Sequence, residues 1–544
     1  MFDDAMTAET DPQAPRSQAG RLSAPWYLGA LCGLLAGALA VGVGLLTAQW
    51  FSTSTPMDAV GSAFIDRVPG WLKRLAIDWF GTNDKRALRI GIYTVMGMLA
   101  LVIGWRALRN RWSGAVGFVS FGALGVLCVL DRPQPSLSTV MPTVLAAVIG
   151  AAALLGLIDV LEGRWRLSHT PHRSRVPLGL DRRSFLVAGG SVAAAAAVTA
   201  ASGVALEGRR VRRLTEGAPA SLPPIASTTV ASQPSTAGAT GAPDASVDNL
   251  ESETPFITPS DDFYRIDTAI SFPNVTTENW QLRIHGMVDR ELVLRYQDVL
   301  SRPQVERTVT LACVSNEVGG DLVGTATWQG VLLADLLAEV GVGKGAEQVY
   351  STSADGWTSG FPVEAALDGR EPMLAIGMNG KPLPVAHGFP ARLVVPGLYG
   401  YVSATKWVTD IKLTTWAEDT GYWVPRGWSA LGPVKAQSRI DVPRRGSTVS
   451  AGTVNLGGVA WAHRRGVARV EVQVNDGPWA EAVLDDRGAL DTWRQWRYAW
   501  EATPGKYRVS VRTTDSTGEV QTDVVRPPDP DGATGHHTRR FTVA

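Results

Sequence analysis

The sequence predicts an α+β protein in which an all-α membrane region of about five helices precedes a domain of mixed α and β structure and an immunoglobulin-like β-sandwich. Three observations support this prediction. Long apolar runs lie within the first 206 residues, shorter apolar runs separated by Gly and Pro begin near residue 251, and strand-like alternation dominates after residue 433. A chain of 544 residues also exceeds the usual size of a single hydrophobic core, so several domains are expected.

Five segments of the first half are long and apolar enough for membrane helices, since crossing the hydrocarbon core takes about 17 to 25 apolar residues. They follow a cytoplasmic tail, residues 1–25, and occupy residues 26–49, 89–105, 114–130, 139–161 and 184–206. Basic residues before the first, third and fifth segments would all lie on the cytoplasmic side. An odd number of spans then predicts a multi-pass cell-membrane protein whose C-terminal region is extracytoplasmic.

The fifth segment begins with Arg182 and Arg183, followed by Phe185 and Leu186, and this pattern resembles a twin-arginine export signal. An ordinary pair of cytoplasmic arginines is the alternative. Further arginines just after the segment favour export of an already folded domain, which hints at a cofactor loaded before export. Residues 207–250 are rich in Ala, Ser, Thr and Pro and predict a flexible linker.

The hydrophobic pattern of the sequence changes at residue 251 and again at residue 433. Residues 251–432 mix strand-like runs with a helical run in which Leu332, Leu333, Leu336 and Leu337 recur at helix spacing. Residues 433–544 contain strand-like runs and the turn sequence Asn475-Asp476-Gly477, as expected of a small antiparallel sandwich. Four tryptophans are expected to anchor its core, namely Trp461, Trp479, Trp493 and Trp496.

Overall charge gives no reason to expect a nucleic-acid partner. The formal net charge is +0, whereas binding to a phosphate backbone requires a clustered basic surface.

Cys313 is the only cysteine after Cys128, so the C-terminal region cannot build an internal disulfide framework. Such a cysteine is either a small buried apolar side chain or a group kept for chemistry. It comes just after a β-type run, residues 308–311.

The segment HGFPARLVVPG, residues 387–397, contains a short strand bounded at both ends by Gly and Pro. We expect a rigid loop and strand end that directs His387 and Arg392 toward one point, an arrangement suited to a phosphate or another anion. Lys406, in the next loop, would add a positive charge.

Together these residues resemble the sulfite oxidase family of molybdopterin enzymes, over roughly residues 251–544. The resemblance implies that Cys313 ligates molybdenum as a thiolate. It also implies that His387, Arg392 and Lys406 contact the pterin and its phosphate. Residues 251–432 would be a sulfite-oxidase-like molybdopterin domain, and the sandwich over residues 433–544 would be of the dimerisation type, so a homodimer is expected.

Other positions match the family more loosely. The sequence SDDFYRID is similar to the family's opening cofactor contact, with Asp261, Tyr264 and Arg265 in matching positions, and Ser353 resembles a further contact. Tyr264 would fit equally well as a core aromatic. Tyr422 stands where the family has a tyrosine near the metal, and both a catalytic role and a packing role stay open.

His463, Arg464 and Arg465 lie where the family's sandwich lends an arginine to the substrate anion. Here an exposed hairpin is the simpler interpretation.

The resemblance implies a membrane-anchored molybdenum-dependent oxidoreductase, with molybdenum-molybdopterin as cofactor and two-electron oxygen-atom transfer on a small sulfur compound as reaction. No haem domain or Cys-rich iron-sulfur segment is visible, and the five spans contain no His, so a separate electron-transfer protein or a quinone is expected as electron partner.

Alternatives remain. One is an S-oxide or N-oxide reductase on the same fold. Another is an exported binding or assembly module that has lost the metal, which the intact Cys313 argues against. A thiol hydrolase is more remote. Animal and plant sulfite oxidases follow the cysteine with Gly-Asn-Arg-Arg, whereas this chain has Val314-Ser315-Asn316-Glu317 there. If Glu317 faced the entrance, it would repel sulfite, so the substrate is left open.

Overall fold

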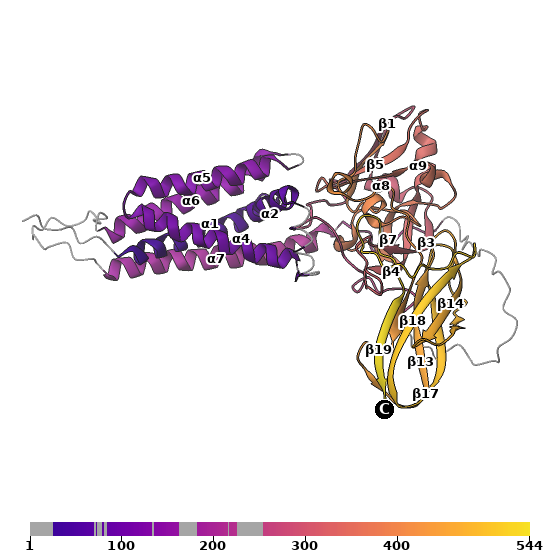
Figure 1. The fold of residues 1–544 in the computed structure, drawn as a ribbon. Helices are drawn as coiled ribbons and strands as arrows, with labels where there is room; N and C mark the ends of the chain where they lie inside the picture. Colours follow the sequence, from indigo (N-terminus) through magenta and orange to yellow (C-terminus); the bar gives the residue numbers. More distant parts are fainter. Residues whose placement is uncertain are drawn as a thin grey trace, which may run out of the picture. The chain divides into compact units, whose positions relative to one another are not determined.

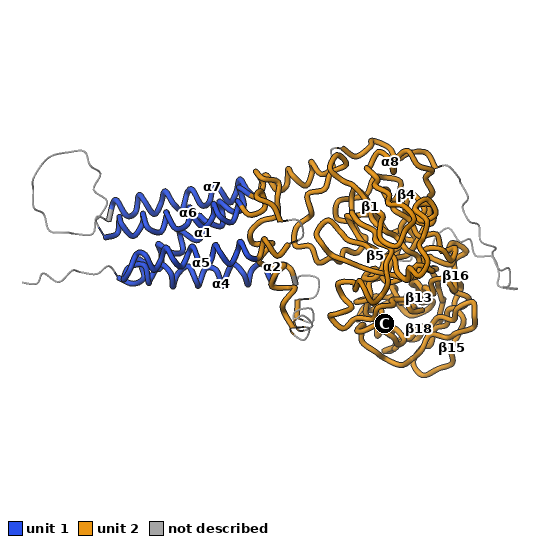
Figure 2. The backbone as a smooth tube through the Cα atoms, turned by 90° about the horizontal axis from the view of Figure 1, so that it is seen from above, with its two compact units in different colours: residues 1–47, 86–127, 141–203 blue, residues 48–85, 128–140, 204–544 orange. Residues whose placement is uncertain are grey.

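The computed structural model falls into two compact units, coloured separately in Figure 2. The first unit comprises residues 1–47, 86–127 and 141–203, and the second comprises residues 48–85, 128–140 and 204–544. The residues described are 25–69, 72, 75, 79–80, 84–132, 135–162, 182–215, 217–225 and 254–544. The predicted cytoplasmic tail and residues 226–250 of the predicted linker lie outside them, residue 25 excepted.

Within the described residues, five helices are long and apolar enough to cross a membrane. They are α1 (Trp26–Trp50), α4 (Asp84–Ala107), α5 (Arg111–Leu130), α6 (Leu137–Leu161) and α7 (Arg182–Leu214), drawn in indigo to magenta in Figure 1. These helices confirm the five segments predicted from the sequence. In the first unit, α1 and α4 approach closely at Gly33 and Gly104, where an added Cβ at Gly33 would lie 2.0 Å from the carbonyl oxygen of Ala100.

The second unit also includes helical residues that precede the mixed domain in the sequence. The helix α2 (Pro56–Arg67) begins with a capping box, in which Thr55 and Asp58 bond each other's backbone N–H groups. The helix α7 continues past the predicted end of the fifth span at residue 206, and its last residue, Leu214, is 2% exposed in the same core as Trp328. The start of the predicted linker is therefore helical.

Two sheets form the mixed domain. In the first, the order is β2-β1-β10-β5-β6, and only the β1–β10 pair is parallel. In the second, the order is β3-β4-β7-β8, and β9 also pairs with β7. The strands are β1 (Gln281–Gly286), β2 (Leu292–Arg295), β3 (Val305–Ala312), β4 (Val323–Leu332), β5 (Gln348–Ser353), β6 (Thr358–Pro362), β7 (Met373–Met378), β8 (Lys381–Pro382), β9 (Arg392–Val394) and β10 (Val408–Thr414).

Short helices close the mixed domain. The predicted helical run forms α9 (Leu333–Val340), whose Leu333, Leu336, Leu337 and Val340 are completely buried at the spacing of one helix face. The others are α8 (Tyr296–Leu300), α10 (Glu364–Leu367), α11 (Gly400–Ser403) and the 3-10 turns η3 (Val385–His387) and η4 (Val424–Arg426).

The C-terminal strands, orange to yellow in Figure 1, form two sheets with the orders β11-β13-β17-β16 and β12-β19-β18-β14-β15. A shared core includes Ile440, Val470, Trp496 and Val509. The strands are β11 (Gln437–Val442), β12 (Thr448–Val449), β13 (Gly452–Trp461), β14 (Val467–Val474), β15 (Trp479–Glu481), β16 (Val483–Leu484), β17 (Arg494–Ala502), β18 (Gly505–Asp515) and β19 (His537–Val543).

The four tryptophans expected in the sandwich core behave differently. Trp496 is buried in that core, whereas Trp461 and Trp493 are buried in the core of the mixed domain, so they fasten the two domains of the second unit together. Trp479 is only partly buried and lies under the guanidinium of Arg512. The predicted turn at Asn475 is present between β14 and β15, and this residue has a positive φ of 51°.

Candidate active site

Cys313 follows directly after the last residue of β3, in the loop that leads to β4, as the sequence predicted. Its N–H donates to the carbonyl oxygen of Leu322 at 2.9 Å, and its own carbonyl accepts from the N–H of Asn316 at 3.0 Å. The side chain of Asn316 closes the loop by accepting from the N–H of Leu322 at 2.9 Å. The Cys313 side chain, 8% exposed, is thus held where two antiparallel strands join.

The surroundings of Cys313 favour the neutral thiol in the protein alone. Burial raises the pKa of the thiol, and this effect outweighs the hydrogen bonds to Ser315 and the positive charge of Lys406. A thiolate would therefore need a further positive charge at the sulfur, which a metal ion supplies.

Arg392 is a buried cation. It is 5% exposed on β9, and its N–H groups donate to the carbonyl oxygens of Leu393 at 3.3 Å, His387 at 3.2 Å and Ala404 at 3.4 Å. Its guanidinium also lies over the ring of Trp328, 4.9 Å from the centroid. Among the described residues, no carboxylate lies within ion-pair distance of it.

This missing counterion matters because a buried charge is costly unless it is paired. Burial lowers the pKa of Arg392 to about 10, so the group is still a cation at neutral pH. The position is therefore suited to an anionic ligand such as a phosphate.

His387 ends the turn η3 and is 5% exposed. Burial, together with the charge of Arg392, lowers its pKa to about 4, so the ring is neutral at pH 7. Nε2 lies 2.8 Å from the carbonyl oxygen of Ser260, and a neutral ring must donate its proton there, which leaves Nδ1 as an acceptor. The ring edge also contacts Phe263 at 5.6 Å between centroids, so the predicted segments around residues 261 and 387 do meet.

Lys406 belongs to a cluster centred on Asp267, a residue that the sequence interpretation missed. Asp267 Oδ2 accepts from Lys406 Nζ at 2.8 Å and from Arg265 Nε at 2.9 Å, and Oδ1 accepts from Lys85 Nζ at 2.6 Å. Burial raises the pKa of Asp267, but the three cations outweigh it and the net pKa is well below the usual range. Burial also lowers the pKa of Lys406 to about 8, against the opposing effect of Asp267.

Tyr264 is partly buried and stacks on Phe263, with 5.2 Å between centroids. Burial raises the pKa of its hydroxyl, a thiolate at Cys313 would act in the same direction, and the charge of Arg392 opposes both. Tyr264 therefore lies in the electrostatic neighbourhood of both residues, and its assignment as a cofactor contact stays a prediction beside a packing role.

The other two predicted cofactor contacts differ in burial. Ser353 ends β5 and is 4% exposed, and its Oγ accepts from the N–H of Asp355 at 3.5 Å. Burial raises the pKa of Asp355, with a further contribution from the charge of Asp267, so this turn adjoins the Asp267 cluster. Asp261, in contrast, is exposed at the start of its segment.

Tyr422 lies elsewhere in the second unit. Its hydroxyl donates to Asp66 Oδ1 of α2 at 2.7 Å, and Arg426 covers its ring with 3.7 Å to the centroid. Burial and the hydrogen bond to Asp66 raise the pKa of the phenol. Among the described residues, its hydrogen bonds and ring contacts do not reach Cys313, so the two predicted catalytic residues are not brought together by a direct contact.

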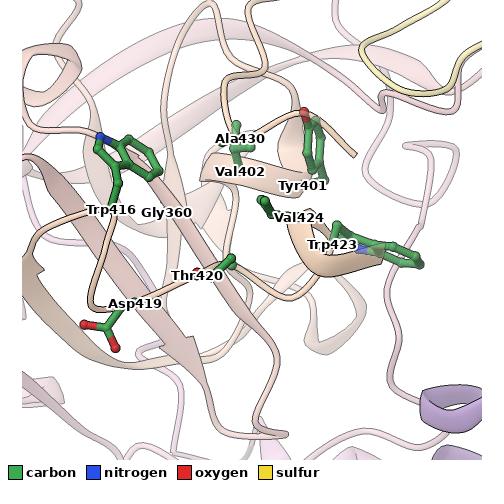
Figure 3. Close-up of a pocket in the computed structure, with 10 residues that line it drawn as sticks. Gly360, Tyr401, Val402, Trp416, Asp419, Thr420, Trp423, Val424 and Ala430 are labelled. Carbon is green, nitrogen blue, oxygen red and sulfur yellow. The ribbon is translucent and has the colours of Figure 1, made fainter. Parts of the chain in front are cut away.

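A cavity of about 150 Å³ lies beside Trp423, the chain neighbour of Tyr422 (Figure 3). Tyr401, Trp416 and Trp423 give it an aromatic lining. Asp419 also borders it, but its carboxylate accepts from Lys412 at 2.8 Å and from Thr414 at 2.7 Å. Neither Cys313 nor Arg392 lines this cavity, so the hollow and the cluster of buried charges are distinct features.

The C-terminal domain supports the Cys313 loop from outside the mixed domain. Arg439 donates to the carbonyl oxygen of Gly320 at 2.9 Å, and His463 Nε2 lies 2.7 Å from the carbonyl oxygen of Thr310 on β3. His463 is 3% exposed, so the expectation of an exposed hairpin is wrong for this residue. His463 is buried because it covers the outer edge of β3. This strand lies at the end of its sheet and pairs with β4 on its other side.

The site combines a buried thiol at a strand end with nearby buried cations, one of which has no carboxylate partner among the described residues. This combination is suited to an anionic, metal-bearing cofactor. The family described as "Oxidoreductase molybdopterin binding domain" matches residues 269–423, a range that includes Cys313, His387, Arg392, Lys406 and Tyr422. This chain belongs to the sulfite oxidase family of molybdopterin oxidoreductases, and its cofactor is molybdenum-molybdopterin.

Individual relatives cover different parts of the chain. The uncharacterized oxidoreductase YuiH of Bacillus subtilis is 35% identical over 153 residues, 28% of this chain and 74% of that protein. Human mitochondrial sulfite oxidase is 29% identical over 326 residues, 50% of this chain. This chain spans 58% of the length of the human enzyme. Sulfite oxidase of Arabidopsis thaliana is 27% identical, covering 50% of this chain and 83% of that protein.

Among solved structures, the sulfane dehydrogenase SoxCD from Paracoccus pantotrophus is similar with a TM-score of 0.46 and 24% sequence identity. The match covers 53% of this chain and 81% of that one.

Proposed function

We propose that this protein is a membrane-anchored enzyme that carries out two-electron oxygen-atom transfer on a small sulfur compound, with Cys313 as the protein ligand of molybdenum. The observation that carries the proposal is the combination of a fixed, buried thiol with a buried arginine that lacks a carboxylate partner. Both requirements of the cofactor, a sulfur ligand and a cationic cradle, are thus met by residues of one unit.

When bound, the cofactor supplies the redox chemistry of oxygen-atom transfer. Cys313 would give up its Sγ proton on becoming a ligand, because burial keeps the thiol neutral in the protein alone. Arg392 and Lys406 would hold anionic groups of the cofactor with charge-assisted hydrogen bonds. His387, neutral and fixed by Ser260, would present Nδ1 to a donor of the pterin.

Tyr422 would orient the substrate. Its hydroxyl proton is engaged by Asp66, but the phenol oxygen retains acceptor capacity. A substrate that reaches this residue would therefore donate a hydrogen bond to the phenol oxygen.

The five apolar helices would anchor the enzyme as a multi-pass protein with its catalytic region on the extracytoplasmic side. Electrons released by substrate oxidation would pass to a separate electron-transfer protein or a quinone. A homodimer is proposed from the family resemblance alone.

A reductase of neutral S-oxides or N-oxides is the second candidate, favoured by one observation. Glu317 is exposed in the loop that carries Cys313, where a negative charge would repel sulfite but not an uncharged oxide.

Purified full-length protein in detergent distinguishes the candidates. After molybdenum and pterin contents are measured, sulfite is offered with ferricyanide, which would consume two ferricyanide ions per sulfite oxidised to sulfate with the oxygen of water. Dimethyl sulfoxide is offered with reduced viologen in the opposite direction. The Cys313→Ser variant should lose turnover in either direction. A molybdenum-loaded protein inactive in both assays would contradict both candidates.

A further inference from the structure

Asp267 binds three cations, and one of them comes from an unexpected part of the chain. Lys406 and Arg265 share Oδ2, while Lys85 alone occupies Oδ1 at 2.6 Å and also donates to the carbonyl oxygen of Ala269 at 2.7 Å. The side chains of Asp267 and Lys406 are 5% and 10% exposed, whereas those of Lys85 and Arg265 are 31% and 39% exposed, so solvent screens the contact with Lys406 least.

Lys85 lies in the first turn of α4, one of the helices long enough to cross a membrane. Lys85 lies well before residues 269–423, the range that the family matches. It nevertheless belongs to residues 48–85, which are part of the second unit together with the catalytic region. The same segment contributes Asp66, which accepts from Tyr422. Two described residues of this segment thus contact the catalytic region: Lys85 binds Asp267, the partner of Lys406, and Asp66 binds Tyr422.

The charges around Asp267 explain what Lys85 can do. Lys85 occupies Oδ1 while Lys406 and Arg265 share Oδ2, so the Lys85 ammonium fixes the orientation of the carboxylate and offsets part of the negative charge that Lys406 faces.

We propose that Lys85 is a positioning residue of the molybdopterin site, which holds Asp267 in place and thereby keeps Lys406 oriented toward an anionic group of the pterin cofactor. This inference rests on the proposed role of Lys406 and Arg392 in the site. It makes Lys85, at the start of the second candidate span, part of the cofactor site in addition to any anchoring role of that helix.

The test uses the full-length protein with Lys85→Met, which keeps the aliphatic stem, and Lys85→Arg, which keeps the charge. Lys435→Met is the matched control, because Lys435 also donates to one carboxylate and one carbonyl, those of Asp531 and Gly532, both at 2.8 Å. Pterin retained by the folded protein is measured over time after dilution, together with the thermal midpoint of cofactor-free protein.

We expect Lys85→Met to lose pterin about tenfold faster than the unmodified protein, a change typical of one charge-assisted contact. Lys85→Arg should restore most of the retention, and the midpoint of cofactor-free Lys85→Met should fall no further than that of Lys435→Met. Unchanged retention in Lys85→Met would overturn the inference, as would a loss of pterin matched by an equal loss of stability without cofactor.

An Arg392→Met variant separates this inference from the proposed site. Pterin lost by Arg392→Met but kept by Lys85→Met overturns the role of Lys85 alone. Pterin kept by both variants overturns the assignment of the cofactor site.

Discussion

Arg392 and Asp267 are both buried charges near the candidate cofactor site, and the protein treats them in opposite ways. Among the residues that the structure describes, the partners of Arg392 are carbonyl oxygens and a tryptophan ring, whereas Asp267 is bound by three cations. A charge that is fully paired mainly holds structure together, while a charge left without a counterion is free to bind a ligand. By this contrast, Arg392 would bind the cofactor directly, whereas the cluster around Asp267 would position the groups that bind it.

The largest expected effect is that of Arg392→Met on cofactor binding. Pterin retention should fall roughly 100-fold, because two or more charge-assisted hydrogen bonds are lost, while the cofactor-free protein should keep its stability, since an unpaired buried cation is costly. Pterin content and thermal unfolding measure the two effects.

Arg439→Met serves as the control for that variant. Arg439 is 8% exposed and pairs with buried Asp441 at 2.6 Å, so its loss should destabilise the cofactor-free protein. If Arg392→Met proved as destabilising as Arg439→Met, Arg392 would be a structural cation and the contrast would fail.

Asp267→Asn should weaken the fold itself. The three cations would then lose the carboxylate that they share, and breaking a buried ion pair costs about 3 kcal/mol. Denaturant unfolding of the cofactor-free protein checks this value. A variant as stable as the unmodified protein would show that the cluster around Asp267 contributes nothing to folding.

The pH dependence of pterin retention should distinguish the two cations. Lys406 has a pKa of about 8 and Arg392 one of about 10, so retention should fall in two steps as the pH rises through these values. Lys406→Met should remove the first step and leave the second. A single step unaffected by this variant would contradict the assignment.

The lowered pKa of Lys406 should change the stability of the fold with pH in the direction opposite to that of pterin retention. Between pH 8 and the ordinary pKa of a lysine, the unfolded chain binds a proton that the folded chain has lost. The free energy of unfolding of the cofactor-free protein should therefore rise over this range as far as Lys406 contributes, even though ligand retention declines.

The smallest expected effect is that of Asp66→Asn on turnover. It removes the carboxylate that accepts the Tyr422 hydroxyl, a contact typically worth about 1 to 3 kcal/mol, and should lower the pKa of that phenol. Turnover should fall a few-fold with a shifted pH profile and unchanged pterin content. Tyr422→Phe with full turnover would remove Tyr422 from the catalytic residues.

Much of this arrangement could be predicted from local sequence. Cys313 at a strand end, the short strand at Arg392 and the five apolar helices each depend on patterns within a few consecutive residues. The meeting of His387 with the segment at Ser260 came only from family resemblance, because no periodicity links positions so distant in the chain.

The remaining features could not be predicted for identifiable reasons. Asp267 stands inside SDDFYRID, but an acid argues against an anion site unless its cationic partners are known. Lys85 and Asp66 act through long-range contacts that composition does not encode. His463 is buried because it covers the edge of β3, an effect of domain packing that an Arg-rich turn sequence conceals.

The hydrogen bonds from Arg439 and His463 have a practical consequence for anyone dividing this chain. A fragment ending at residue 432 would contain every proposed ligand and cofactor contact, yet it would expose the outer edge of β3 and release the carbonyl of Gly320. The C-terminal domain is therefore a scaffold for the Cys313 loop as well as a candidate surface for self-association, and the smallest excised piece worth assaying extends to the last strand.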